Sequence, residues 1–275
     1  MNYIHSNYRK AGKISNSDLL YTLSVFITEP ISWSALYEWR SLTPMEICAI
    51  AGFWKSIGDA MSISYHELKR NGNWKDGLEF GEDITEWAQN YEKMYMVPAE
   101  SNKKTADELV PLLLFYVPGW AVPMAKDLVG VMMGDRLRKS MMYPAPSAFS
   151  TYLVSIIFAL RRFITLFLLP PRPSFLSARQ VMDEADPATG RYNVVEYLAH
   201  PYYSKPTFWN RWGPEAWFVR LSGGTVPGEK EWLPEGYKIE EVGPRGVKGK
   251  GAKDLQEQEV RIREVRGLGC PFARV

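Results

Sequence analysis

Apolar residues in this chain recur at the three- and four-residue spacing of a helix, and prolines interrupt that recurrence. No stretch before residue 190 alternates apolar and polar residues for long enough to require a β-strand. Because a proline removes a backbone hydrogen bond inside a helix, these prolines mark expected helix boundaries. We therefore predict an all-α fold for the first two thirds of the chain, with six or so helices and no internal repeat.

Local signals predict where several helices begin and end. Ser15 to Asp18 offers N-cap candidates, and the helix that follows should end near Pro30. Thr43-Pro44-Met45-Glu46 is a capping box with proline in the first helical position, and it should start the next helix. Asp83 or Thr85 should cap a third helix. Further helices are expected over residues 101–116, 122–142, 147–169 and 253–266.

Composition changes after Leu169, where PPRP leads into a tail that is dense in glycine, proline and tryptophan. The aromatic side chains of this tail give it apolar surface to bury, so we expect an ordered but irregular segment. We predict a helical core over residues 1–170 and an irregular extension over residues 171–275 that packs on the core within the same domain. A chain of 275 residues can bury a core of that size.

The most apolar stretch runs from Ser147 to Leu169 and reaches the length of about 20 residues that a membrane-spanning helix needs. Arg161 and Arg162 lie near its middle, where charged side chains are costly in hydrocarbon. A second stretch, 109–133, is interrupted by prolines and charges. We interpret both as core helices rather than spans, and peripheral membrane contact remains open. The first residues contain no apolar run, so a secretory signal is not expected.

Charge and motifs speak against several classes of function. The 33 Lys and Arg against 31 Asp and Glu leave a formal charge of +2, which gives no attraction for nucleic acid. The two cysteines form neither a disulfide framework nor a zinc-binding spacing, and they fit a reducing or cytosol-facing environment. No GxSxG, P-loop or GxGxxG motif occurs, so hydrolase, NTPase and dinucleotide-binding functions have little support.

Three histidines occur in the chain, His5, His66 and His200, and none belongs to a local metal-binding pattern such as HExxH. We therefore do not expect a multi-histidine metal centre. A haem needs only one axial histidine in an apolar pocket, and a chain with few histidines can supply it. The aromatic content of 13% and the 11 methionines are compatible with such a pocket, although ordinary core packing explains them more simply.

Longer strings carry more information than composition does. They are IHSNYRKAGKISNSDLLYTLSVFITEPISWSALYEWRSLTPMEICAIAGFWKSIGDAMSI, ITEWAQNYEKMYMVPAESNKKTA, DPATGRY, HPYYSKPT, RWGPEAW, GGTVPGE, LPEGYKIEEVGP and CPF. Together they extend over almost the entire chain. In these strings the chain resembles the fungal ER-bound oxygenases of the mpaB type, which share a catalytic domain with bacterial rubber oxygenase.

The resemblance implies a globin-like helical core that binds haem b, with a proximal histidine on the iron and dioxygen as co-substrate. His5 falls where the family's proximal histidine lies, so we predict that His5 binds the haem and its iron. By itself, a histidine so near a terminus is expected to be frayed and exposed. Arg40, Arg161 and Arg162 could approach the haem propionates, but structural ion pairing or snorkelling fits each of them better.

The resemblance also implies an activity and a location. Its best understood members cleave a carbon–carbon double bond in an isoprenoid chain, so we expect a haem-dependent oxygenase that cleaves or oxygenates a small apolar, isoprenoid or terpenoid substrate. The expected location is the cytosolic face of the ER membrane, or otherwise the cytoplasm. The alternative is a non-catalytic, haem-free helical paralogue that binds a lipid or a partner.

The chain departs from the family's pattern at its N-terminal end. In rubber oxygenase an arginine, a threonine and a proposed glutamate base precede the proximal histidine, whereas four residues precede His5. We therefore expect that the N-terminal part of the family's domain, with the membrane anchor of many fungal members, is missing from this chain. A degenerate paralogue is the other interpretation.

Overall fold

The computed structural model describes residues 2–173, 184–197, 199–243, 246, 248–264 and 271–272. In this part of the chain the regular structure is helical, and extended segments meet at an isolated bridge between Tyr192 and Tyr237. The all-α prediction is confirmed, while the globin-like arrangement stays a prediction. The chain divides into two compact units, residues 1–97 with 155–169 and 250–275, and residues 98–154 with 170–249. Our division at residue 170 stays a prediction.

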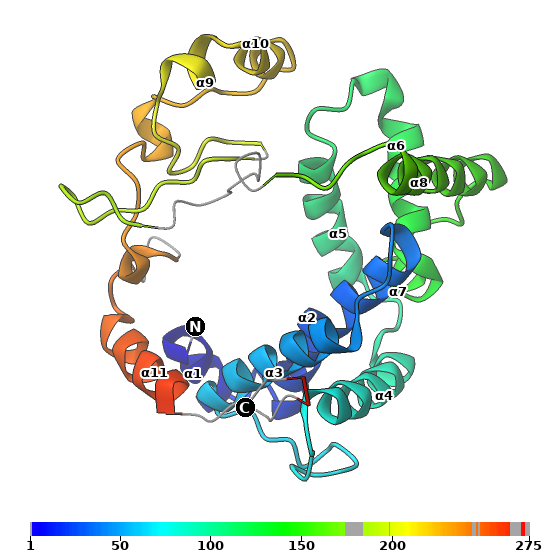
Figure 1. Cartoon of the computed structure of the whole chain (residues 1–275), viewed down its shortest axis with the longest axis vertical. Coiled ribbons are helices and arrows are strands. Elements are labelled where there is room, and N and C mark those ends of the chain that lie inside the picture. The colour runs from blue at the N-terminus through cyan, green and yellow to red at the C-terminus, as the bar shows by residue number, and fades with distance from the viewer. Residues whose placement is uncertain are drawn as a thin grey trace. The chain divides into compact units, whose positions relative to one another are not determined.

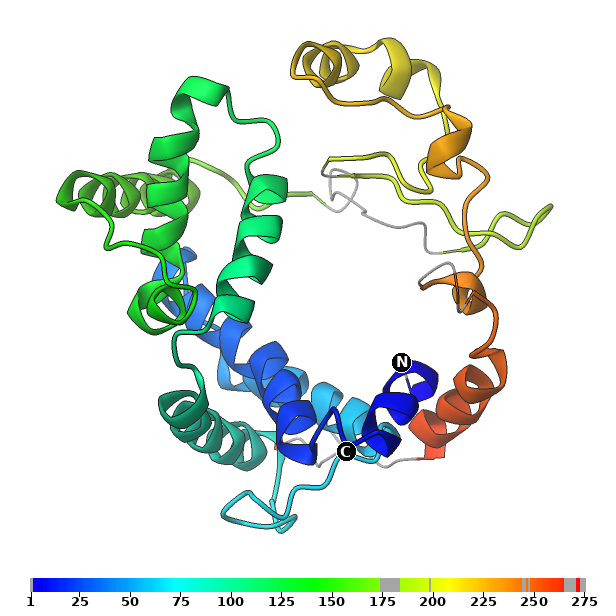
Figure 2. The same ribbon diagram turned by 180° about the vertical axis from the view of Figure 1, so that it is seen from behind.

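The first unit is built around three mutually packed helices (Figure 1), and Figure 2 shows the same helices from behind. They are α2 (Asn16–Tyr37), α3 (Pro44–Ala60) and α4 (Gly77–Tyr95). Their shared core includes the fully buried side chains of Leu20, Ile27, Phe80 and Ile84. Two shorter helices, α1 (Asn2–Lys10) and α11 (Ala252–Glu264), contact each other, and α11 also contacts α3.

Two capping boxes start helices where the sequence predicts them. Thr43 donates its backbone N–H to the Glu46 carboxylate over 2.8 Å, and the Glu46 N–H donates back to the Thr43 hydroxyl over 3.3 Å. Ser15 and Asp18 form the same arrangement at the start of α2. The predicted end near Pro30 is wrong, because α2 continues to Tyr37. Beyond the proline, the rings of Trp33 and Tyr37 pack on Phe158, and this contact compensates for the missing hydrogen bond.

The predicted caps of the next helix are also wrong. Asp76 caps α4, because its carboxylate accepts the N–H groups of Leu78 and Glu79 over 3.0 Å each. Asp83 and Thr85 lie inside the helix, where Asp83 is buried. Several side chains in and after the turn-rich segment can cap a helix, and the apolar spacing favoured Asp83 and Thr85 over the earlier Asp76.

The second unit contains shorter helices joined by irregular segments. They are α5 (Glu100–Leu113), η1 (Gly119–Ala121), α6 (Val122–Met132), α7 (Gly134–Ser140), α9 (Phe208–Trp212), α10 (Pro214–Leu221), η3 (Lys230–Trp232) and η4 (Ile239–Glu241). The single helix expected over 122–142 is therefore two, since Gly134 has a φ of +71°, which interrupts a right-handed helix. The tail is irregular as predicted, and Cys270 lies outside the described residues.

Helix α8 (Ala148–Phe167) begins in the second unit and ends in the first. The helix is confirmed, but our interpretation of 147–169 as a core element is wrong, since only 11% of its most apolar window is buried. In the stretch 109–133 only Val110 and Gly130 are buried, and the other residues are intermediate or exposed. Within the described residues, α2 and α8 are long and apolar enough to cross a membrane by length and composition alone.

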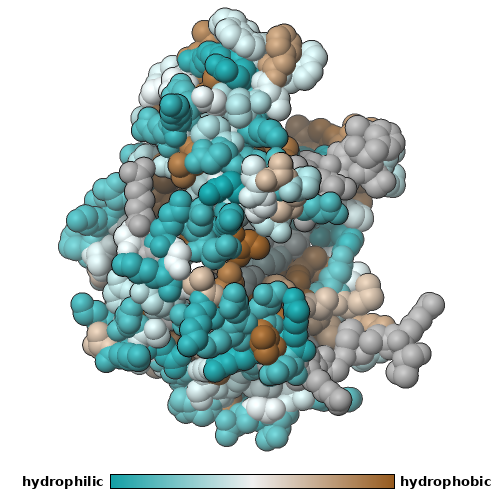
Figure 3. All heavy atoms as spheres, turned by 90° about the vertical axis from the view of Figure 1, so that its left-hand side faces the viewer, coloured by the Kyte–Doolittle hydropathy of each residue, from teal (hydrophilic) through white to brown (hydrophobic). Residues whose placement is uncertain are grey.

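Helix α11 fits its expected character as a charged, solvated helix. None of its side chains is buried, and Arg263 pairs with Glu259 one turn earlier over 2.6 Å. In Figure 3 the lower part of the molecule, on the side where α11 lies, is mostly hydrophilic. Its described end at Glu264 leaves the last predicted residues, 265–266, outside the described part of the chain.

Two glycines of α4 give a matched test of how closely α3 and α4 pack. A Cβ on Gly77 would lie 2.5 Å from the Cys48 carbonyl oxygen, whereas a Cβ on Gly81 would lie 3.5 Å from the Ala51 Cβ. We expect Gly77→Ala to lower the free energy of unfolding by about 2 kcal/mol through overpacking. Gly81→Ala should leave it unchanged or raise it by up to about 1 kcal/mol, since alanine favours the helix. Urea unfolding followed by circular dichroism measures both, and equal losses would contradict the packing described.

Candidate functional site

His5 lies in α1, a helix that the sequence analysis did not expect. The α1 helix is fixed to the end of α3, because Arg9 donates from Nη1 to the Met61 carbonyl over 3.3 Å. The His5 side chain lines two adjoining spaces, an apolar cavity of about 270 Å³ and a polar groove of about 220 Å³. The residue is half-buried, so the frayed and exposed state expected from its position alone is not observed.

The cavity beside His5 is lined almost entirely by apolar side chains of α2 and α3. Its walls include Leu19, Leu23 and Phe26 from α2, and Trp54, Ile57 and Met61 from α3 and its C-cap. The rings of Phe26 and Trp54 stack with centroids 4.2 Å apart, which forms a flat aromatic wall. The cavity is slightly smaller than ordinary ligand pockets of about 300–1,000 Å³, so it takes a small apolar group or part of a larger one.

The polar groove on the other side of His5 brings two arginines to the end of α3. Arg9 binds the Met61 carbonyl, and Arg261 of α11 donates to the Ser62 hydroxyl over 3.4 Å. Asp254 and Glu257 line the same groove. A ligand at His5 would therefore meet an apolar wall on one side and mixed charges on the other.

The environment of His5 keeps its imidazole neutral. Burial lowers the pKa of His5, and nearby positive charges, Arg9 among them, lower it further. Its Nδ1 atom is buried without a hydrogen-bond partner among the residues that the structure describes. A neutral imidazole is the form that binds a metal, and because Nδ1 is enclosed by the protein, Nε2 is the nitrogen that a metal would have to reach. His5 therefore matches the ligand type of an axial haem histidine, and a haem, which is larger than the cavity of about 270 Å³, would extend from it into the adjoining groove.

His66 lies at an exposed turn, whereas His200 shares with His5 a buried Nδ1 atom that has no hydrogen-bond partner among the described residues. The Nδ1 atom of His66 lies 2.9 Å from the Ser64 hydroxyl at an exposed turn. The ring of His200 stacks on Trp232 in the second unit, with centroids 4.6 Å apart and planes 8° from parallel. In the described part of the chain, no three His, Cys, Asp or Glu side chains gather as they would around a metal held by protein ligands alone.

Two of the three arginines considered for haem propionates are bound to the protein's own carboxylates. Arg40 makes two hydrogen bonds of 2.7 Å to Glu46, and Arg161 makes two of 3.0 and 3.1 Å to Glu38. The Arg40 guanidinium, together with the Thr43 cap, lowers the pKa of Glu46 to about 2. The ion pairing that the sequence favoured is therefore observed, and Arg162 is exposed. The sequence did not identify Arg9 and Arg261 as the arginines that lie beside His5.

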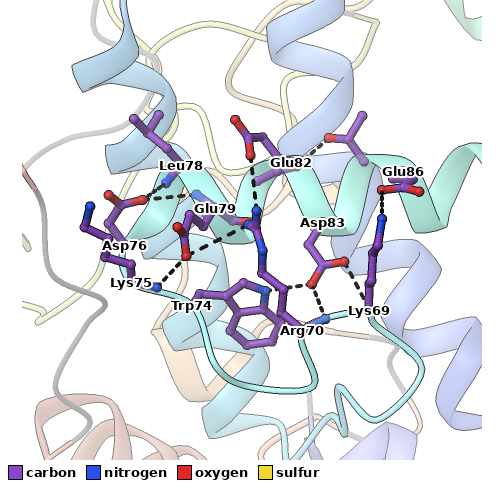
Figure 4. A network of polar contacts seen from close by, with 12 residues as sticks. Lys69, Arg70, Trp74, Lys75, Asp76, Leu78, Glu79, Glu82, Asp83 and Glu86 are labelled. Carbon is purple, nitrogen blue, oxygen red and sulfur yellow. Dashed lines mark hydrogen bonds and ion pairs between the residues drawn. The ribbon is translucent and has the colours of Figure 1, made fainter.

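A buried carboxylate on α4 was also missed, and it organises the loop before that helix (Figure 4). Asp83 is 5% exposed and accepts three hydrogen bonds: from the backbone N–H groups of Lys69 and Arg70 over 3.1 and 2.9 Å, and from Trp74 Nε1 over 2.8 Å. Arg70 in turn donates to the Glu79 carbonyl over 2.8 Å. Because its acceptor sites are occupied by the fold, this carboxylate is structural rather than catalytic.

The lowered pKa of His5 predicts how acid affects stability. Below the ordinary histidine pKa of 6.5 the unfolded chain takes up a proton at this site, while the folded chain resists it, so stability is lost as pH falls. We expect the free energy of unfolding to fall less in His5→Gln than in the wild type when the pH is lowered from about 7.5 to about 5.5. These two values lie on either side of the ordinary histidine pKa of about 6.5. Urea titrations at both pH values measure this, and equal pH dependence in the two proteins would contradict a buried neutral His5.

Comparison with known proteins identifies relatives of this chain. No family profile and no solved structure matches the chain. It is 40% identical over 274 residues to the ER-bound oxygenase mpaB' of Penicillium brevicompactum, which covers 98% of this chain and 64% of that protein. It is 36% identical over 264 residues to the ER-bound oxygenase mpaB of the same fungus, which covers 94% of this chain and 58% of that protein. A similar protein of Penicillium roqueforti (strain FM164), also named ER-bound oxygenase mpaB, is 42% identical over 142 residues, 51% of this chain and 48% of that protein. The chain thus spans less than two thirds of each relative's length.

Proposed function

Since this chain belongs to the mpaB-type family of fungal proteins, we propose that it is the helical, haem-binding part of an oxygenase that acts on an apolar chain. The observation that carries the proposal is His5, an imidazole with a lowered pKa at the wall of an aromatic cavity. Haem b, when bound, would supply an iron centre able to react with dioxygen.

The residues around His5 have distinct roles in this proposal. His5 would hold the iron, since its lowered pKa keeps the imidazole in the neutral form that binds a metal. Phe26 and Trp54 provide a flat apolar surface that excludes water from the cavity. Arg9 and Arg261, rather than Arg40 and Arg161, are the guanidinium groups near His5, and we assign them to the propionate carboxylates, which guanidinium binds well.

The apolar lining also supports a substrate class. Leu19, Leu23, Ile57 and Met61 line the cavity with apolar side chains, and Asp18 and Thr22 are its polar members besides His5. A substrate that approached a haem at this wall would therefore be apolar, such as an isoprenoid or terpenoid chain. The relatives are named ER-bound, so we propose that the protein works at the cytosolic face of the ER membrane, where such substrates partition. If the protein does not associate with the ER membrane, we propose that it works in the cytoplasm.

One observation favours a second candidate function. The cavity of about 270 Å³ is small, and a haem-free protein could hold a lipid tail there without any oxygen chemistry. This alternative predicts that a lipid, and no haem, binds beside His5.

Oxygen incorporation tests the proposed activity. The chain, loaded with haem b, is incubated under ¹⁸O₂ with a panel of acyclic isoprenoids that includes squalene, and the products are analysed by mass spectrometry. We expect aldehyde, ketone or hydroxyl products that carry the label, and none from His5→Ala. A folded, haem-loaded chain that transfers no label to any member of the panel would contradict the proposal.

A further inference from the structure

Helix α8 exposes its most apolar face. Six large side chains follow one another at spacings of three and four residues, so they form one stripe along the helix. We call this the α8 stripe: Phe149, Tyr152, Ile156, Leu160, Phe163 and Phe167. Even the least exposed of the six, Phe163, is 52% exposed, and Tyr152 is 71% exposed. A stripe of this kind on a soluble domain normally faces the core.

The opposite face of α8 makes the contacts with the rest of the fold. Ser150 and Val154 are buried, and Phe158 packs on the rings of Trp33 and Tyr37. On the same face, Arg161 donates to the Glu38 carboxylate and to the Tyr37 carbonyl. The helix is therefore already anchored through its smaller and more polar side, and its apolar side is turned away from those contacts.

The charge of this segment indicates what covers the stripe. Between residues 147 and 173 the chain contains three arginines and no aspartate or glutamate. Arg161 is paired with Glu38, so the exposed Arg162 and Arg172 are the basic groups that can meet a partner. Arg162 is exposed, and its long side chain can reach past the apolar surface to a polar layer. Apolar side chains on one face with basic residues beside them match the acyl chains and the anionic headgroups of a membrane.

We propose that α8 lies in the plane of an anionic membrane surface, with the α8 stripe among the acyl chains. This inference rests on the proposed ER association and deepens it, because it names the element that touches the lipid. Helix α8 lies along the membrane instead of crossing it. A span would carry the Arg161–Glu38 pair and Arg162 into hydrocarbon, where charges are costly.

Vesicle flotation of the full chain tests the proposal. The wild type should float with phosphatidylcholine vesicles that contain phosphatidylserine, and less with phosphatidylcholine alone or at high salt. Leu160→Gln with Phe163→Gln should weaken partitioning about a hundredfold, since two large apolar side chains leave the lipid. The matched control is Trp209→Gln with Leu221→Gln on α9 and α10, whose side chains are 73% and 85% exposed and which should bind as the wild type does.

Folding and haem uptake are measured on the same proteins without vesicles, by circular dichroism and visible absorption. These readings separate a failure of this inference from a failure of the proposed function. The inference is overturned if the α8 double variant, folded like the wild type, binds vesicles equally well. It is also overturned if the membrane-bound wild type resists extraction with alkaline carbonate, as a membrane-spanning protein would. A third contrary result is a wild type that does not float with vesicles and forms a dimer through the α8 stripe.

Discussion

Asp83→Ala is expected to lower the free energy of unfolding by about 3–5 kcal/mol, a large fraction of the stability of an ordinary domain. The substitution leaves the N–H groups of Lys69 and Arg70 and the indole N–H of Trp74 without their acceptor in a buried place. Each unsatisfied donor costs about 1–3 kcal/mol, and the three costs are not additive because the loop relaxes as one piece. Urea unfolding followed by circular dichroism gives the value.

Two variants separate the role of Asp83 from a general effect of charge on α4. Asp83→Asn keeps one acceptor oxygen and should cost less than Asp83→Ala. Glu82→Ala removes the exposed neighbour, whose contact with Arg70 is a surface ion pair of 3.7 Å, and should change stability by less than about 1 kcal/mol. If Asp83→Ala and Glu82→Ala had the same effect, the hydrogen-bond network of Figure 4 would not hold the loop as described.

His5→Ala is expected to weaken haem binding by at least about a hundredfold, because even the groups that only orient a metal ligand contribute 10–100-fold to affinity. The reason is the loss of the imidazole that lines the apolar cavity. Absorbance titration with haem b measures the affinity. His66→Ala is the matched control, since His66 lies at an exposed turn and should bind haem as the wild type does. Equal affinity in the two variants would remove His5 from the site.

The sequence predicted helix starts better than helix ends. The boxes at Ser15 and Thr43 are local, because the cap and its partner lie three residues apart and need no tertiary contact. The end at Pro30 failed because distant residues decide it: Phe158 supports the last turns of α2, and nothing near Pro30 shows this. The core position expected for α8 is wrong because an apolar stripe on a helix does not show which element, if any, of the same chain packs on it, and in this structure the stripe is exposed.

The site was only partly accessible from the sequence. His5 was identified through the family resemblance, since a histidine near a terminus carries no local pattern. Part of the cavity wall could have been predicted, because its residues follow the helical spacing from which α2 and α3 were predicted. The apolar faces of these two helices could have been proposed as one surface, which includes Leu19, Leu23, Trp54 and Ile57. Arg9 and Arg261 could not have been paired, because only the packing of α11 against α1 and α3 brings them together.

A titration with haem b shows directly whether His5 is a haem ligand. The folded chain is titrated with haem b while its visible absorption spectrum is recorded, and His5→Ala is titrated in parallel. We predict a Soret band in the wild type that saturates at one haem per chain and is lost in His5→Ala. A folded wild-type sample without that band, or an unchanged band in a folded His5→Ala sample, would contradict the account.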